Sequence, residues 1–98
     1  MELNSVTLCG QVAEIKPLRY TPAGIAVLEF RVSHTSTQMQ NGMKRQAECE
    51  LQVLALGEVA KDAAKLNVGA QVKLEGFLAR RSKNSTQLVL HVNNVETE

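Results

Sequence analysis

Three positive charges fall within four residues near the C-terminal end of the chain, at Arg80, Arg81 and Lys83. Serine, asparagine and threonine residues surround them, and apolar stretches flank the segment on both sides. A chain reversal between two strands needs only a short turn containing Asn or Gly, so repelling charges in this connection require another explanation. Clustered Arg and Lys side chains hold phosphate oxygens through charge-assisted hydrogen bonds. The segment therefore predicts either a binding loop for an anionic ligand or a solvated loop that keeps the protein soluble.

Most other basic residues are also separated from acidic residues along the chain. No Asp or Glu occurs in the windows 15–28, 30–47 and 76–95, and these windows hold eight of the eleven basic residues. A protein of formal net charge +1 can still present a positive surface to a polyanion when its charge is segregated in this way. The residues that we expect to contact a nucleic acid are Arg19, Tyr20, Arg31, Lys44, Arg45, Arg80, Arg81 and Lys83.

Aromatic side chains, on which single-strand binders stack bases for about 1–3 kcal/mol per base, are scarce. The chain has Tyr20, Phe30 and Phe77 and no Trp. Phe30 lies in register with apolar neighbours, which favours a place in the core. Tyr20 lies beside a turn and is the ring most expected to be exposed. Phe77 follows Gly76, where a bulge would re-aim the side chain, so its position stays open.

Residues that could support catalysis or a metal are few. The only Asp is Asp62, between lysines, and the two histidines have no Cys or Asp beside them in sequence. Cys9 and Cys49 are far apart and lack the close pairing of zinc ligands, so we expect both to be small buried hydrophobes of a reducing compartment. No phosphate-binding glycine motif follows a strand. The sequence indicates a binding module, not an enzyme, with no cofactor and no metal.

Length and hydropathy favour one domain in the cytoplasm. A chain of 98 residues is too short for two cores, so we expect a single domain over 1–98. The apolar runs are too short to cross a membrane. The N-terminal sequence MELNSVTL lacks the basic start and apolar block of a signal peptide.

The elements that must position the basic residues are five strands. Apolar and polar residues alternate, or nearly so, over 6–12, 28–32, 47–55, 70–80 and 87–95, which is the period of half-buried strands. Gly10 in the first strand suggests a bulge or bend. A turn is expected at 21–24 and a hairpin at Asn41-Gly42, although the polar run 36–40 predicts a long, mobile connection there. The face of the third strand that we expect to be apolar carries Ala47, Cys49, Leu51, Val53 and Ala55.

One short helix is expected between the third and fourth strands. In the segment 58–66, Val59, Ala63 and Leu66 recur with helical spacing, and Asn67 and Gly69 end it. Five strands with a helix in this place favour an all-β OB-fold, which binds oligonucleotides across its second and third strands and the adjoining loops. The acid-free windows cover those segments. A small SH3-like barrel would show a similar periodicity.

The chain resembles primosomal replication protein N, the PriB family, in three stretches that follow the family's order: RYTPAGIAVLEFRVSH, NGMKRQAECE and VGAQVKLEGFLARRSKNSTQLVLHV. The resemblance runs from about residue 4 to residue 96. The shared G-x-x-V-x-x-E-G-x-L pattern also occurs in single-stranded DNA-binding proteins, whereas the Pro-Ala-Gly turn followed by His34, together with RQAxC, is more specific.

The resemblance implies a homodimeric OB-fold that binds single-stranded DNA during replication restart. It implies the PriA helicase as a partner and, in some bacteria, the DnaT loader and single-stranded DNA-binding protein. Arg81 and Lys83 match basic residues of the DNA-binding loop between the fourth and fifth strands. Met43 and Glu48 stand where family members carry bulky aromatics, and Glu48 would repel a phosphate.

Two alternatives remain open from the sequence. A general single-stranded DNA-binding protein has the same barrel followed by a long tail with an acidic tip, whereas this sequence ends at VETE after the last strand. A protein-interaction module would use the basic loops to contact an acidic partner. Binding of labelled oligo-dT at low salt separates the DNA-binding functions from the protein-interaction module.

Overall fold

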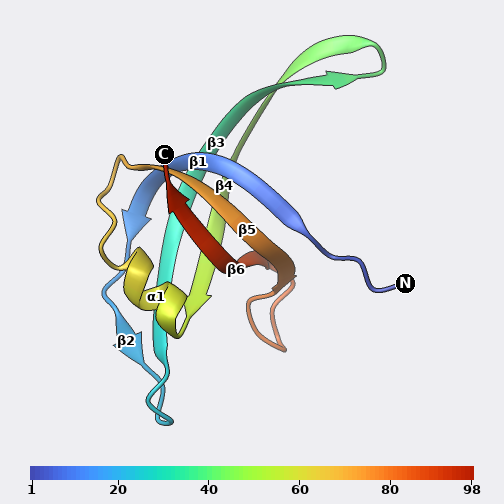
Figure 1. The fold of residues 1–98 in the computed structure, drawn as a ribbon. Helices are drawn as coiled ribbons and strands as arrows, with labels where there is room; N and C mark the ends of the chain where they lie inside the picture. Colours follow the sequence, from blue (N-terminus) through green and yellow to red (C-terminus); the bar gives the residue numbers. More distant parts are fainter.

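The computed structural model describes all residues, 1–98 (Figure 1). Its elements are six strands and one helix: β1 (Val6–Ile15), β2 (Arg19–Tyr20), β3 (Ala26–Gln40), β4 (Met43–Leu56), α1 (Glu58–Ala63), β5 (Gln71–Arg80) and β6 (Leu88–Thr97). The five expected strands are present, and the two-residue β2 is an addition inside the first connection. No helix is long and apolar enough to cross a membrane.

Five of the strands close into a barrel. β1 pairs with β5 on one edge and with β3 on the other, β3 pairs with β4, β4 runs parallel to β6, and β6 pairs with β5. Every neighbour relation around the ring is therefore filled, and only β4–β6 is parallel. This closed five-stranded barrel with one small helix confirms the OB-fold that the strand pattern predicted.

The core is the inner face of the barrel. Phe30 is 2% exposed, as its register with Leu28 and Val32 predicted. On β4, Val53 lies opposite Phe30 and Ala55 lies opposite Leu28. Alternate residues of a strand point to opposite faces, so the residues between them lie on the outer surface. Other fully buried core members come from the remaining barrel strands: Val12, Val72, Leu74 and Leu90.

Helix α1 is shorter than predicted, and Ala60 adds to the buried face. It begins after Gly57, whose φ of 68° favours glycine, and it ends at Ala63 instead of residue 66. Ala60 and Ala63 are buried, while Val59 is half-buried. Small alanines let the helix approach the barrel closely. The expected stripe of Val59, Ala63 and Leu66 does pack on the core, although Leu66 lies beyond the end of the helix.

Two glycines allow strands to come close enough to close the barrel. A Cβ on Gly10 would meet Val32 Cγ1 and lie 2.6 Å from the Ser33 carbonyl oxygen, so Gly10 marks the crossing of β1 over β3. The bulge predicted there lies two to four residues later, where the β1–β3 register shifts between Val12 and Glu14. Gly76 does lie at a register shift, between β5 and β6, as the sequence suggested.

The hairpin of β3 and β4 continues beyond the barrel as an arm, residues 35–48, in which the two strands pair only with each other (Figure 1). The predicted mobile connection at 36–40 was wrong, because these polar residues form the end of β3. The turn at the end of the arm consists of Asn41 and Gly42 alone, with φ of 53° and 73°. These angles are those of a two-residue hairpin turn, which keeps polar strands paired up to the tip.

Both cysteines are exposed, contrary to the prediction. Cys9 lies on the outer face of β1, because it is an odd number of residues away from Val12, which is buried. Cys49 shares the inward phase of Val53, but it lies at the base of the arm, where the barrel no longer supplies a core. The alternation was correct for both strands, and the error lay in where the core ends.

Candidate nucleic-acid interface

Glu29 of β3 holds two arginines from separate loops. Its carboxylate oxygens lie 3.5 Å from Arg19 Nη2, in β2, and 3.4 Å from Arg81 Nη2, in the β5–β6 loop. The Glu29 side chain is 20% exposed, whereas those of Arg19 and Arg81 are 59% and 48% exposed. A partly buried carboxylate thus fixes two guanidinium groups that still face solvent.

The other two charges of the opening motif are Arg80, the last residue of β5, and Lys83, in the β5–β6 loop, residues 81–87. Arg81 N–H donates to the Gln87 carbonyl at 3.0 Å and closes the loop. Arg80 Nη1 donates to the Lys83 carbonyl at 3.0 Å, and Lys83 itself is exposed. We name Arg19, Arg80, Arg81 and Lys83 the loop cluster. With Glu29 it carries four positive charges and one negative charge.

Arg31 is brought near Glu29 along β3 but is neutralised. Its Nε lies 2.8 Å from a Glu50 carboxylate oxygen and its Nη2 lies 4.0 Å from Glu14. The Nε–H is not directed at an acceptor, so the contact with Glu50 is an ion pair without a good hydrogen bond. The window 30–47 contains no acidic residue, but Arg31 is still paired in the folded protein, because Glu14 and Glu50 come from neighbouring strands.

Lys44 and Arg45 lie far from the loop cluster. They are exposed at the tip of the arm, where Lys44 faces Met39 and Arg45 donates to Gln40 Oε1 at 2.6 Å. Glu29 and Met39 are ten residues apart on one strand, about 33 Å at the usual rise. The structure therefore divides the predicted basic residues into a loop cluster and a separate tip.

Aromatic residues are exposed at two positions. Tyr20 of β2 is 57% exposed, as expected, and adjoins Arg19. Phe77 is 38% exposed, which answers the open question of the sequence, and its ring is stacked on His91. At the positions where related proteins were expected to carry aromatics, Met43 is 67% exposed and Glu48 is exposed on β4.

Glu29 is the residue of this candidate site that the sequence did not single out. It was treated only as the residue that separates two acid-free windows. That position was a signal for one of its two partners, because the basic segment that precedes Glu29 contains Arg19. The contact with Arg81, 52 positions away, could be seen only after the barrel closed.

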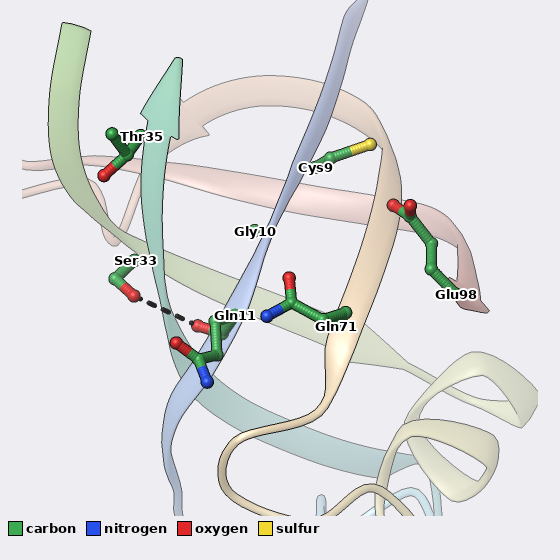
Figure 2. A pocket seen from close by; sticks show the side chains of 7 residues that line it. All are labelled: Cys9, Gly10, Gln11, Ser33, Thr35, Gln71 and Glu98. Carbon is green, nitrogen blue, oxygen red and sulfur yellow. Dashed lines mark hydrogen bonds between the residues drawn. The ribbon is translucent and has the colours of Figure 1, made fainter. Parts of the chain in front are cut away.

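A polar hollow of about 270 Å³ lies beside β1, at the point where the pairing of β1 with β3 ends (Figure 2). Ser33 Oγ donates to the Gln11 carbonyl at 3.4 Å, and the Glu98 carboxylate faces Cys9. A hydrogen bond to Glu98, together with the negative charge of that carboxylate, raises the pKa of the Cys9 thiol. The only formal charge lining this hollow is negative, so it is a poor site for a phosphate.

Comparison with known proteins agrees with this geometry. A family model described as another single-strand binding protein family matches residues 4–94. The chain is 37% identical over 91 residues to the replication restart protein PriB of Nitrosomonas europaea, covering 93% of this chain and 84% of that protein. It is 36% identical over 93 residues to PriB of Neisseria meningitidis serogroup C, covering 95% and 92%.

A solved structure shows the same architecture. The protein PriB from Ralstonia solanacearum superposes with a TM-score of 0.91 at 29% identity, over 99% of each chain. The resemblance noted in three stretches of the sequence thus extends over the whole barrel. The chain belongs to the PriB family of replication restart proteins, within the single-strand binding proteins.

Proposed function

We propose that this protein binds single-stranded DNA in replication restart and that the loop cluster holds the DNA phosphates. The observation that carries the proposal is the convergence of Arg19 and Arg81 on Glu29. A guanidinium has five N–H donors, and one contact with a carboxylate leaves donors for a phosphate. Because Glu29 already orients both side chains, less conformational entropy is lost on binding.

The remaining parts of the function follow from family membership. We propose that the protein assists the PriA helicase, with DnaT and single-stranded DNA-binding protein as further partners, and that it acts in the cytoplasm, where bacterial DNA is replicated. Binding without catalysis fits the loop cluster, which offers charge and hydrogen-bond donors. Lys44 and Arg45 at the arm tip would hold a second segment of the strand, and Arg31 would contribute little while Glu50 and Glu14 neutralise it.

Changing Arg19 to Ala tests whether both loops contact one strand. For single strands, log K falls with log salt by about 0.7 for each phosphate neutralised, so R19A should flatten that slope by about 0.7 and weaken oligo-dT binding. Lys65→Ala is the matched control, because Lys65 is exposed near the end of α1 and away from the loop cluster. Fluorescence anisotropy at several salt concentrations measures both. Equal effects of the two changes would contradict a site at the loop cluster.

We also propose that the protein is a homodimer that pairs along β1. From Val6 to Gly10, β1 pairs with β5 on one edge, and its pairing with β3 begins only at Gln11. On the other edge His34 Nδ1 contacts the Cys9 carbonyl at 2.6 Å, while no strand pairs with that edge at Thr7. An edge of this kind pairs readily with a second copy.

Sedimentation equilibrium should show a dimer at micromolar concentration. Val12 directs its N–H and C=O toward the β5 side, so Thr7, an odd number of residues away, directs its own to the free edge. Thr7→Pro removes that free N–H and should give a folded monomer. A wild-type monomer, or a Thr7→Pro dimer, would overturn this interface.

A further inference from the structure

An apolar hollow of about 160 Å³ lies on the outside of the barrel, beside β4, β6 and α1. Its apolar lining comes from Leu54, Leu56, Val59, Phe77 and Val92, and His91, stacked on Phe77, and Asn93 complete it. The two ring centroids are 5.2 Å apart and the planes differ by 7°. Leu56 is 52% exposed and Phe77 is 38% exposed. The hollow thus presents a flat aromatic pair beside exposed apolar side chains.

The strand register places this hollow in line with the loop cluster. Glu29 of β3 pairs with Leu54 of β4, Leu54 pairs with His91 of β6, and His91 pairs with Phe77 of β5. These residues form one row across four neighbouring strands. Strands lie about 4.8 Å apart, so His91 and Phe77 are about 10–15 Å from the carboxylate that holds Arg19 and Arg81. That distance corresponds to about three to four stacked nucleotides.

The side chains of this row share the outer face. Glu29 lies between buried Leu28 and Phe30, Leu54 lies between buried Val53 and Ala55, and His91 lies between buried Leu90 and Val92. Alternation along each strand therefore directs the row away from the core. A ligand that contacts the arginines at β3 can reach the aromatic pair by following the outside of the barrel across β4 to β6 and β5.

We propose that this hollow receives a base of the bound single strand, which stacks against Phe77 and His91 and packs on Leu54. The proposal rests on the function proposed above. The flat ring pair suits a base because stacking needs a π-face and tolerates any sequence. Continuity with the loop cluster favours a nucleic acid over an apolar segment of a protein, since a polyanion would contact both features at once. The site would supply a salt-independent part of binding in a chain with few aromatic side chains.

Phe77→Leu is the first test, since it keeps an apolar side chain and removes the flat ring. A lost stack of about 1–3 kcal/mol corresponds to roughly 5- to 150-fold weaker oligo-dT binding. Because stacking releases no counterions, the affinity should fall equally at every salt concentration and the salt slope should not change. Arg81→Ala, measured beside it, should change the slope. Circular dichroism checks that both variants are folded.

Phe77→Trp is the second test and uses the absence of any Trp from the chain. Its fluorescence should be quenched when oligo-dT binds and should stay unchanged when an abasic oligomer of the same length binds through its phosphates. Val68→Trp is the matched control, because Val68 is 65% exposed on the loop after α1 and lies off the row. That reporter should not respond to either oligomer.

The outcomes separate this inference from the proposed function. Wild-type affinity in Phe77→Leu, together with an unquenched Phe77→Trp, would overturn the base site, while a salt slope that still depends on Arg81 would leave DNA binding intact. Loss of helicase capture by Phe77→Leu with unchanged DNA affinity would assign the hollow to a protein partner instead. A wild-type protein that binds no oligo-dT at low salt would remove the proposed function and the base site together.

Discussion

Replacing Arg80, Arg81 and Lys83 together with alanine is expected to flatten the salt dependence of oligonucleotide binding by about two units, because each phosphate contact contributes about 0.7. A slope change of about two units acts over the roughly 1.3 decades between 1 M and 50 mM salt, so the loss of three contacts should weaken binding at about 50 mM salt by several hundredfold. The β5–β6 loop lies outside the core, and changes at such surface positions usually alter stability by within about 0.5 kcal/mol. Anisotropy titrations of labelled oligo-dT at several salt concentrations measure the slope.

The chain offers a control of equal charge for this triple change. Lys61, Lys65 and Lys73 are the three basic residues outside the acid-free windows, and Lys61 already pairs with Glu58 at 3.3 Å. Removing these three lysines lowers the net charge by the same amount without touching the loop cluster. If the control variant loses as much affinity and slope as the loop variant, then binding reflects overall charge and the loop is merely solvated.

Gly76→Ala is expected to destabilise the fold by at least about 3 kcal/mol. A Cβ at this position would collide with the backbone carbonyl of His91 and lie 2.8 Å from Val92 Cα. Overpacking against side chains usually costs about 1–3 kcal/mol, and backbone atoms of a paired strand have less freedom to move aside. For a domain of this size each kcal/mol lowers Tm by about 4–8 °C, so the melting temperature should fall by more than about 12 °C.

Gly42→Ala separates this steric effect from backbone strain. Gly42 has a φ of 73°, but nothing lies within 4 Å of an added Cβ. A left-handed alanine costs roughly 1–2 kcal/mol, so its melting temperature should fall by a smaller amount. Equal losses in the two variants, measured by thermal unfolding, would mean that β6 adjusts freely at the bulge and that the close approach of Gly76 is not required.

Local patterns in the sequence were sufficient for most of the barrel. Alternation of apolar residues gave the strands and buried Phe30, and the Thr21–Gly24 turn closes with a hydrogen bond from Gly24 N–H to the Thr21 carbonyl at 2.8 Å. These features depend on neighbours within a few residues. The errors at Cys49 and at residues 36–40 share a different cause, because β3 and β4 remain paired in the arm whereas the core ends at its base.

The candidate site depended on pairings that sequence periodicity does not encode. Arg81 meets Glu29 and Arg31 meets Glu50 only because the barrel brings β3, β4 and the β5–β6 loop together. The sequence therefore identified the basic residues but not the carboxylates that they contact. In the same way, Phe77 and His91 could be noted singly, and their stacking follows from the register of β5 with β6.

The central claim is that the loop cluster binds the phosphates of single-stranded DNA. A titration of the wild-type protein with labelled oligo-dT across several salt concentrations tests it most directly. Four contacts, from Arg19, Arg80, Arg81 and Lys83, predict that log K falls with log salt by about 2–3, plus any contribution from the arm tip. A folded protein that shows no binding at low salt, or binding with a slope near zero, would contradict the claim.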